Sequence, residues 1–188
     1  MDSKHANLED KPLWLIDIDG VLNAYKYSRR KPNTWHWGEE VHNLRLVTDY
    51  GIFAVWVAEG LVRFLNDIHA SGLVDMQWCT TWAHEANTVF APAFNLPELP
   101  VAAHPDETIL AWKHRAAIDA SERGRRLIWT DDDAIDKGAK LKVKNNLANH
   151  SHLTVEKDLL LIIPNPKVGL TPADCRSIAA FVGFDTTL

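Results

Sequence analysis

The chain has 188 residues, of which 46% are hydrophobic, and a formal net charge of -5. A chain of this length is typically one domain with a substantial core, and we expect residues 11–188 to form that domain behind a loose tail at 1–10. The mildly negative charge excludes a general electrostatic attraction to nucleic acid or to membranes, although a local basic patch can still bind phosphates.

The start of the chain is polar and lacks the apolar core of a signal peptide, and no apolar stretch approaches the roughly 20 residues that span a bilayer. The two cysteines, Cys79 and Cys175, are too few for a disulfide scaffold. We therefore expect a cytoplasmic protein with no membrane partner.

Short apolar runs alternate with helical patterns along the chain. The runs are residues 13–16, 76–80, 100–103, 127–130 and 159–163, and helices are predicted at 61–68, 108–120 and 172–182. The last helix has a clear N-terminal signature, with Thr171 as N-cap and Pro172 at the first helical position. The alternation predicts an α/β fold with a mostly parallel sheet flanked by helices on both faces.

One segment departs from this alternation. Residues 41–47 and 52–57 are two strand-like runs joined by the turn Asp49-Tyr50-Gly51, which predicts a β-hairpin after the first strand. The region 137–156 is polar, and its pattern assigns no element.

The first apolar run ends in Asp17-Ile18-Asp19-Gly20, so it delivers two carboxylates to the edge of the sheet. Gly20 permits an immediate turn after the strand, which lets the two carboxylates converge. Asp17 could then face a phosphorus atom while Asp19 donates a proton. A helix cap or a solvated turn is the alternative interpretation of this pair.

Other runs end in residues suited to phosphate chemistry. The run at 76–80 ends in Thr80-Thr81, Lys113 precedes the fourth run, and that run ends in Asp131-Asp132-Asp133. Gathered at one edge, these carboxylates would repel one another, and oxygen-ligated Mg²⁺ removes that repulsion. The structural alternatives are an ordinary strand threonine, a lysine on a helix surface and an acidic helix cap.

The ordered set resembles the haloacid dehalogenase (HAD) superfamily of phosphotransferases with an aspartate nucleophile. Its four motifs are an Asp-x-Asp-Gly strand end, a Thr or Ser strand end, a Lys, and a strand ending in paired acids. They correspond here to Asp17-Ile18-Asp19-Gly20-Val21, Thr80, Lys113 and Asp131-Asp132. The resemblance covers about residues 13–133 and implies a HAD-like, Rossmann-like fold in which residues of about 24–57 form a small flap, hence a minimal cap.

The resemblance also implies a role for each residue. Asp17 would be the nucleophile and a Mg²⁺ ligand, and Asp19 would be the general acid/base and would bind the metal through its backbone carbonyl. Thr80 and Lys113 would hold the phosphoryl group. Asp132 would be the other acidic ligand with support from Asp131, and Asp133 competes for one of these roles. Thr81 competes for the role of Thr80. The implied activity is a Mg²⁺-dependent phosphomonoesterase that acts through an aspartyl-phosphate.

A basic and aromatic segment follows the nucleophile and includes Lys26, Arg29, Arg30, Lys31, Trp35 and His36. Such segments bind phosphates and stack on bases, so a nucleotide or a nucleic-acid end is the candidate substrate. A weaker resemblance to HAD domains associated with bacterial and phage RNA-repair proteins points the same way. The alternatives are a solvated basic loop, a non-catalytic nucleic-acid-binding module, and a phosphotransferase with an acceptor other than water.

Overall fold

The computed structural model describes residues 11–24, 36–38, 41–102, 109–134 and 137–188. Its strands are β1 (Leu13–Ile16), β2 (Val41–Thr48), β3 (Gly51–Ala58), β4 (Asp75–Trp78), β5 (Leu127–Thr130) and β6 (Leu159–Ile162). Its helices are α1 (Glu59–Ser71), the π-helix η3 (Ala86–Phe90), α2 (Ala91–Ala93), α3 (Ile109–Glu122), α4 (Lys137–Ala148), α5 (Val155–Asp158) and α6 (Pro172–Val182). None of the described helices has both the length and the apolar character needed to cross a membrane.

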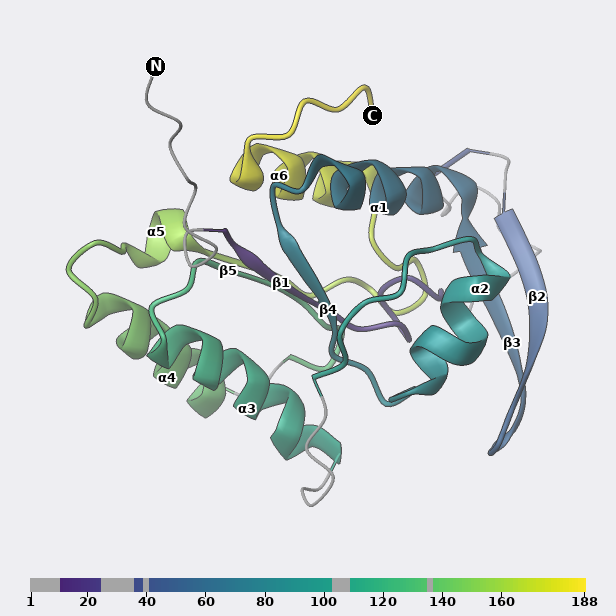
Figure 1. Ribbon diagram of the computed structural model, residues 1–188, viewed down its shortest axis with the longest axis horizontal. Coiled ribbons are helices and arrows are strands. Elements are labelled where there is room, and N and C mark those ends of the chain that lie inside the picture. The colour runs from purple at the N-terminus through teal and green to yellow at the C-terminus, as the bar shows by residue number, and fades with distance from the viewer. Residues whose placement is uncertain (1–10, 25–35, 39–40, 103–108, 135–136) are drawn as a thin grey trace.

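The central sheet has the order β4-β1-β5-β6, and each neighbouring pair is parallel. Helices α1 and α6 cover one face, whereas α3 and α4 cover the other (Figure 1). The predicted α/β architecture is therefore confirmed. Because β4 lies on one side of β1 and β5 lies on the other, the direction of winding reverses at β1.

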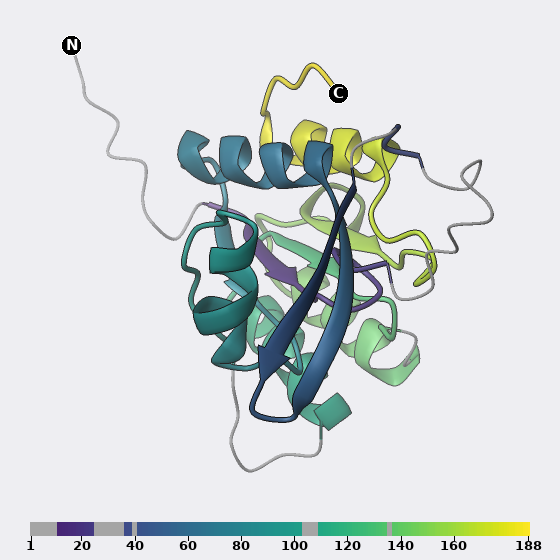
Figure 2. The ribbon, with the colours of Figure 1, turned by 90° about the vertical axis from the view of Figure 1, so that its right-hand side faces the viewer.

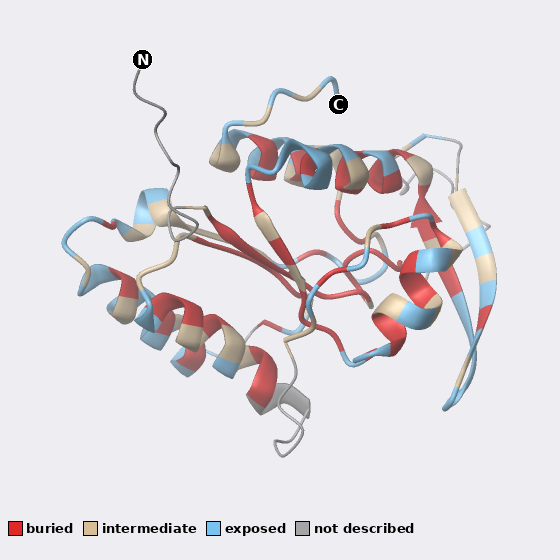
Figure 3. Cartoon of the chain, viewed as in Figure 1, coloured by how far each residue is buried: buried red, intermediate tan, exposed pale blue. Residues whose placement is uncertain are grey.

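Strand β1 is buried on both faces, which explains its continuous apolar sequence. Trp14 and Ile16 pack in the cluster beneath α1 and α6, and Leu13 and Leu15 pack in the cluster against α3 and α4. This period-two division is the expected geometry of a strand between two helical layers. Figure 3 shows the buried strands between helices whose outer faces are exposed.

The predicted hairpin is confirmed as the antiparallel pair β2–β3, which lies outside the central sheet (Figure 2). The predicted last helix is also confirmed. Thr171 and Asp174 form a capping box at its start: the Asp174 amide donates to the Thr171 hydroxyl at 3.2 Å, and the Thr171 amide donates to the Asp174 carboxylate at 2.8 Å.

The prediction of a strand at 100–103 was wrong within its described part. Val101 forms one isolated parallel bridge with Trp78, made by the Trp78 amide to the Pro100 carbonyl and by the Ala102 amide to the Trp78 carbonyl. Pro100 has no amide hydrogen and cannot extend the ladder. Two other runs are shorter than predicted, since β4 ends at Trp78 and β6 ends at Ile162, and the unassigned region contains α4.

Candidate active site

The carboxyl ends of β1 and β5 bring two of the predicted acids to one edge of the sheet. Asp17 follows β1, and its amide donates to the Thr130 carbonyl at 3.0 Å, so the parallel ladder extends past the strand end. Asp131 follows β5, and its amide donates to the Ile162 carbonyl at 3.3 Å. Backbone pairing thus places both acids where the winding reverses, the position at which open α/β sheets bind ligands.

A tight turn follows Asp17 and contains Asp19. The Ile18 carbonyl accepts the amides four and five residues further along the chain, both at 2.8 Å. Gly20 has a φ of +73°, and a Cβ atom there would lie 2.3 Å from the Asp132 carboxylate. Gly20 is therefore needed both for the left-handed backbone and for the close approach of Asp132.

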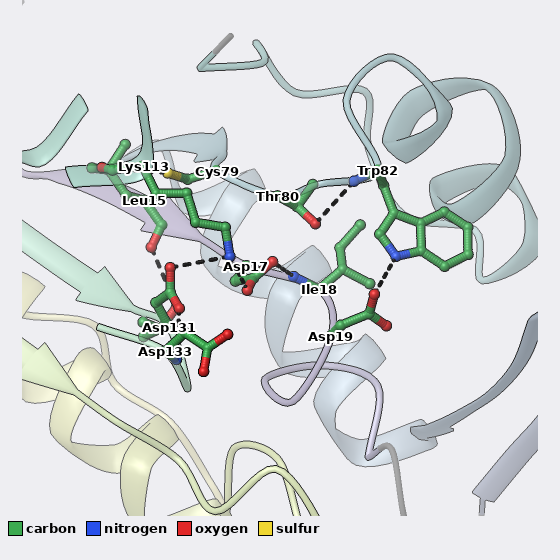
Figure 4. A network of polar contacts seen from close by, with 11 residues as sticks. Leu15, Asp17, Ile18, Asp19, Cys79, Thr80, Trp82, Lys113, Asp131 and Asp133 are labelled. Atoms are coloured by element: carbon green, nitrogen blue, oxygen red, sulfur yellow. Dashed lines mark hydrogen bonds and ion pairs between the residues drawn. The ribbon is translucent and has the colours of Figure 1, made fainter. Parts of the chain in front are cut away.

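Lys113 reaches the two strand-end acids from α3 (Figure 4). Its Nζ atom lies 2.5 Å from Asp17 Oδ2 and 3.3 Å from Asp131 Oδ2, and none of the three side chains is more than 5% exposed. Burial raises the pKa of Asp17 to about 7, although Lys113 acts to lower it. Burial alone lowers the pKa of Lys113, but the two carboxylates outweigh burial and raise it. The lysine is therefore part of a buried ion-pair network and does not extend from the helix surface.

Asp17, Asp131 and Asp132 each offer a carboxylate oxygen, and these oxygens all lie within 4.8 Å of one another. Asp132 is half-buried, and burial together with Asp133 and Asp131 raises its pKa to about 6. Among the described residues, the ammonium group of Lys113 is the one paired with these carboxylates, so this part of the cluster carries excess negative charge. These hard oxygen ligands fit a divalent cation such as Mg²⁺.

The structure distinguishes among the three consecutive acids. Asp133 is exposed and outside the carboxylate cluster, although its amide donates to Asp131 Oδ1 at 2.9 Å. Asp131 is only 1% exposed and accepts that amide while also pairing with Lys113. Asp131 and Asp132 are thus the members of the run that lie with Asp17.

Asp19 points away from Asp17 in this structure (Figure 4). Its Oδ2 atom accepts the Trp82 indole N–H at 2.9 Å, and its Oδ1 atom accepts the Asn23 side-chain amide at 2.8 Å. Asn23 is itself buried and accepts the Trp56 backbone amide of β3 at 2.9 Å. The Asp19 side chain is therefore oriented by the loop after β4 and, through Asn23, by the hairpin.

The two adjacent threonines occupy different environments. Thr80 is 1% exposed, and its side chain acts to lower the pKa of Asp17. Thr81 is exposed. Of the two alternatives, Thr80 is the one that lies with Asp17.

Most of the predicted substrate-binding segment lies outside the described residues, including Lys26, Arg29, Arg30, Lys31 and Trp35. His36 is described and is exposed. The neighbouring Trp37 has a packing role, because its indole N–H donates to the Leu170 carbonyl at 2.7 Å and its ring lies against Gly60. These contacts tie Trp37 to the folded domain and leave its ring partly exposed.

Sequence reasoning assigned no role to Asn23, Trp82 or Glu85. Asn23 and Trp82 hydrogen-bond with Asp19, and Trp82 and Glu85 line a small hollow that Asp19 also borders. Asn23 closes the Asp19 turn, and the segment after Thr80 supplies Trp82. No periodic pattern marks these contacts, because they depend on how the hairpin packs over the loop after β4.

Comparison of the chain with protein-family models, curated proteins and solved structures found no match.

Proposed function

We propose that this protein is a Mg²⁺-dependent phosphomonoesterase of the HAD type, with Asp17 as the nucleophile. The observation that carries the proposal is the convergence of Asp17, Lys113, Asp131 and Asp132 at the edge of a parallel sheet where the winding reverses. A buried lysine and a set of hard oxygen ligands around one carboxylate suit phosphoryl transfer, in which negative charge must be neutralised.

In the first step, an Asp17 carboxylate oxygen attacks the phosphorus atom of a phosphate monoester. The phosphorus–oxygen bond to the leaving group breaks, and Asp19 protonates the departing oxygen. The Asp17 acyl phosphate is then attacked at phosphorus by water, while Asp19 accepts the proton of that water. Inorganic phosphate leaves, and both carboxyl groups return to their starting states.

The other buried residues support the transferring group. Lys113 supplies a positive charge 2.5 Å from the nucleophile, and the Thr80 hydroxyl lies beside it. Asp17, Asp131 and Asp132 would hold the Mg²⁺ ion, which when bound neutralises charge on the phosphoryl oxygens. In this structure the Asp19 carboxylate is held by hydrogen bonds from Trp82 and Asn23.

The test is hydrolysis of a generic aryl phosphate by the wild type and by Asp17→Asn, with Mg²⁺ and with EDTA. We expect metal-dependent release of phosphate by the wild type and a loss of at least about 10³-fold in the variant, because its nucleophile is absent. Asp133→Asn is the matched control, since Asp133 is exposed and outside the cluster, and should retain activity. Equal activity of Asp17→Asn and wild type would refute the mechanism.

A further inference from the structure

The tip of the β2–β3 hairpin exposes four large apolar side chains within seven residues. Val47 is 70% exposed, Tyr50 is 82%, Ile52 is 68% and Phe53 is 45%. They divide between the two faces of the hairpin. Val47 and Ile52 are register partners on the outer face, whereas Phe53 is on the inner face and its ring lies 5.8 Å from that of Trp82.

The inner face borders a hollow of about 130 Å³. Tyr50 and Phe53 line it from the hairpin, Trp82 and Glu85 line it from the segment after β4, and Asp19 is also part of its lining. Sites for drug-sized ligands have volumes of roughly 300–1,000 Å³, so this hollow suits a single ring system.

The charges in the hollow restrict what it can bind. Glu85 is 4% exposed, and its Oε1 atom accepts the Asp49 backbone amide at 2.7 Å. Asp19 adds a second carboxylate to the lining of the hollow. Two carboxylates among aromatic rings accept N–H groups and disfavour an anion, so the hollow suits an aromatic group with N–H donors and without a negative charge.

The position of the hollow relates it to the proposed reaction. Asp19 lies between it and Asp17, since the Asp19 carboxylate is turned toward Trp82 (Figure 4). One substrate molecule could therefore place its phosphate group at Asp17 and a ring in the hollow. The part of the molecule that joins them would run past Asp19. A sugar between a phosphate and a base is a connection of this kind.

We infer that the hollow lined by Tyr50, Phe53, Trp82 and Glu85 binds the leaving group of the substrate, and that this group ends in a nucleobase-like ring with an N–H donor. The substrate class is a nucleoside monophosphate, without a further phosphate on the base side. This inference rests on the proposed phosphomonoesterase function and adds the specificity of the same site.

The first test compares kcat/KM for adenosine 5′-monophosphate with that for ribose 5-phosphate, which lacks the base. We expect the nucleotide to be preferred by about tenfold or more, because a base stacked on aromatic side chains contributes substantially to binding. Phe53→Ala should reduce this preference several-fold by lowering the value for the nucleotide alone. Ile52→Ala is the matched control: it removes an exposed apolar side chain from the outer face and should keep the preference.

The Glu85 contribution is tested with purine riboside 5′-monophosphate, in which a hydrogen atom replaces the exocyclic amino group, so that the base has no N–H donor. Wild type should prefer the adenine nucleotide, and Glu85→Gln should reduce that preference, because a neutral amide can donate as well as accept. The glutamine can still accept the Asp49 amide and so preserve the hairpin contact.

The outcomes separate the two proposals. Hydrolysis of the nucleotide and of ribose 5-phosphate with equal efficiency, unaffected by Phe53→Ala, would overturn the leaving-group inference and leave the phosphatase intact. Failure of the wild type to hydrolyse any of these esters or an aryl phosphate in the presence of Mg²⁺ would overturn the proposed function, and the leaving-group assignment with it.

Discussion

The edge of the central sheet and the tip of the hairpin have opposite distributions of polarity. At the sheet edge, the charged side chains of Asp17, Lys113 and Asp131 are almost completely buried. At the hairpin tip, apolar side chains such as Tyr50 and Ile52 are exposed. The first region is fixed by strand pairing and by helices on both faces, whereas the second is a local structure at the surface. Under the proposed function, the core positions the reactive groups and the inner face of the hairpin selects the substrate.

The largest expected effect comes from Lys113→Met, which leaves Asp17 and Asp131 without their buried counter-charge. Removing one partner of a buried pair costs about 3–5 kcal/mol, and we expect a loss of that size in the free energy of unfolding without metal. Urea denaturation measures it. Lys142→Met is the control, because the Lys142–Glu122 pair is about half exposed and should contribute at most about 1 kcal/mol. Similar losses in the two variants would contradict the importance of the buried network.

Gly20→Ala should have the next largest effect. Both Gly20 and Gly72 have positive φ angles, but a Cβ atom at Gly20 would lie 2.3 Å from Asp132, whereas one at Gly72 would meet no atom within 4 Å. Gly72→Ala should therefore cost about 1–2 kcal/mol from backbone strain alone. Gly20→Ala should cost about 1–3 kcal/mol more from the steric overlap. Thermal denaturation of the two variants gives the difference, and equal losses would mean that Asp132 moves aside without cost.

A smaller effect is expected on how stability and cation binding depend on pH. Burial raises the pKa of Asp17 to about 7 and, with its acidic neighbours, the pKa of Asp132 to about 6, both above the ordinary value of 3.8. These groups therefore contribute to stability of the metal-free protein below about pH 4, and that contribution is lost as the pH rises through about 6 and 7. A cation requires the charged forms, so its binding should strengthen over the same range.

The measurement is the increase in melting temperature produced by Mg²⁺ at about pH 5.5 and at about pH 8. We expect the larger increase at the higher pH. The Asp132→Asn variant should show a smaller increase at both values, because it lacks one of the clustered carboxylates. An equal increase at the two pH values in the wild type would argue against a cation at these acids.

The central strands could be predicted from the sequence because their environment is uniform. Residues 13–16 and 127–130 are continuous apolar runs, and they are buried on both faces as β1 and β5. Helix α4 gave no such signal: its buried side chains are Ala139, Val143 and Leu147, a single narrow stripe in an otherwise polar segment. The run at 100–103 gave a strand signal but forms no strand in its described part. Its composition is apolar, but Pro100 has no amide hydrogen to donate to a neighbouring strand.

The candidate site also has features that could be predicted from the sequence and features that could not. That Asp17 and Asp131 would meet could be predicted, because parallel strands end at one edge of a sheet. The orientation of Asp19 toward Trp82 could not be predicted from the sequence, and the position of Glu85 beneath the hairpin turn could not be predicted either. Both depend on the docking of β2–β3 over the segment after β4, which joins residues far apart in the sequence.

The smallest expected effect on stability belongs to the hairpin tip and completes the comparison. Ile52→Thr replaces an exposed apolar side chain on the outer face with another β-branched residue, so the free energy of unfolding should change by no more than about 0.5 kcal/mol. Val55→Thr changes the same strand at a fully buried position and should cost about 1–3 kcal/mol, because the new hydroxyl loses its contact with water. Urea denaturation of the pair tests this. If Ile52→Thr were as damaging as Val55→Thr, the tip would be part of the folded core and not a local structure at the surface.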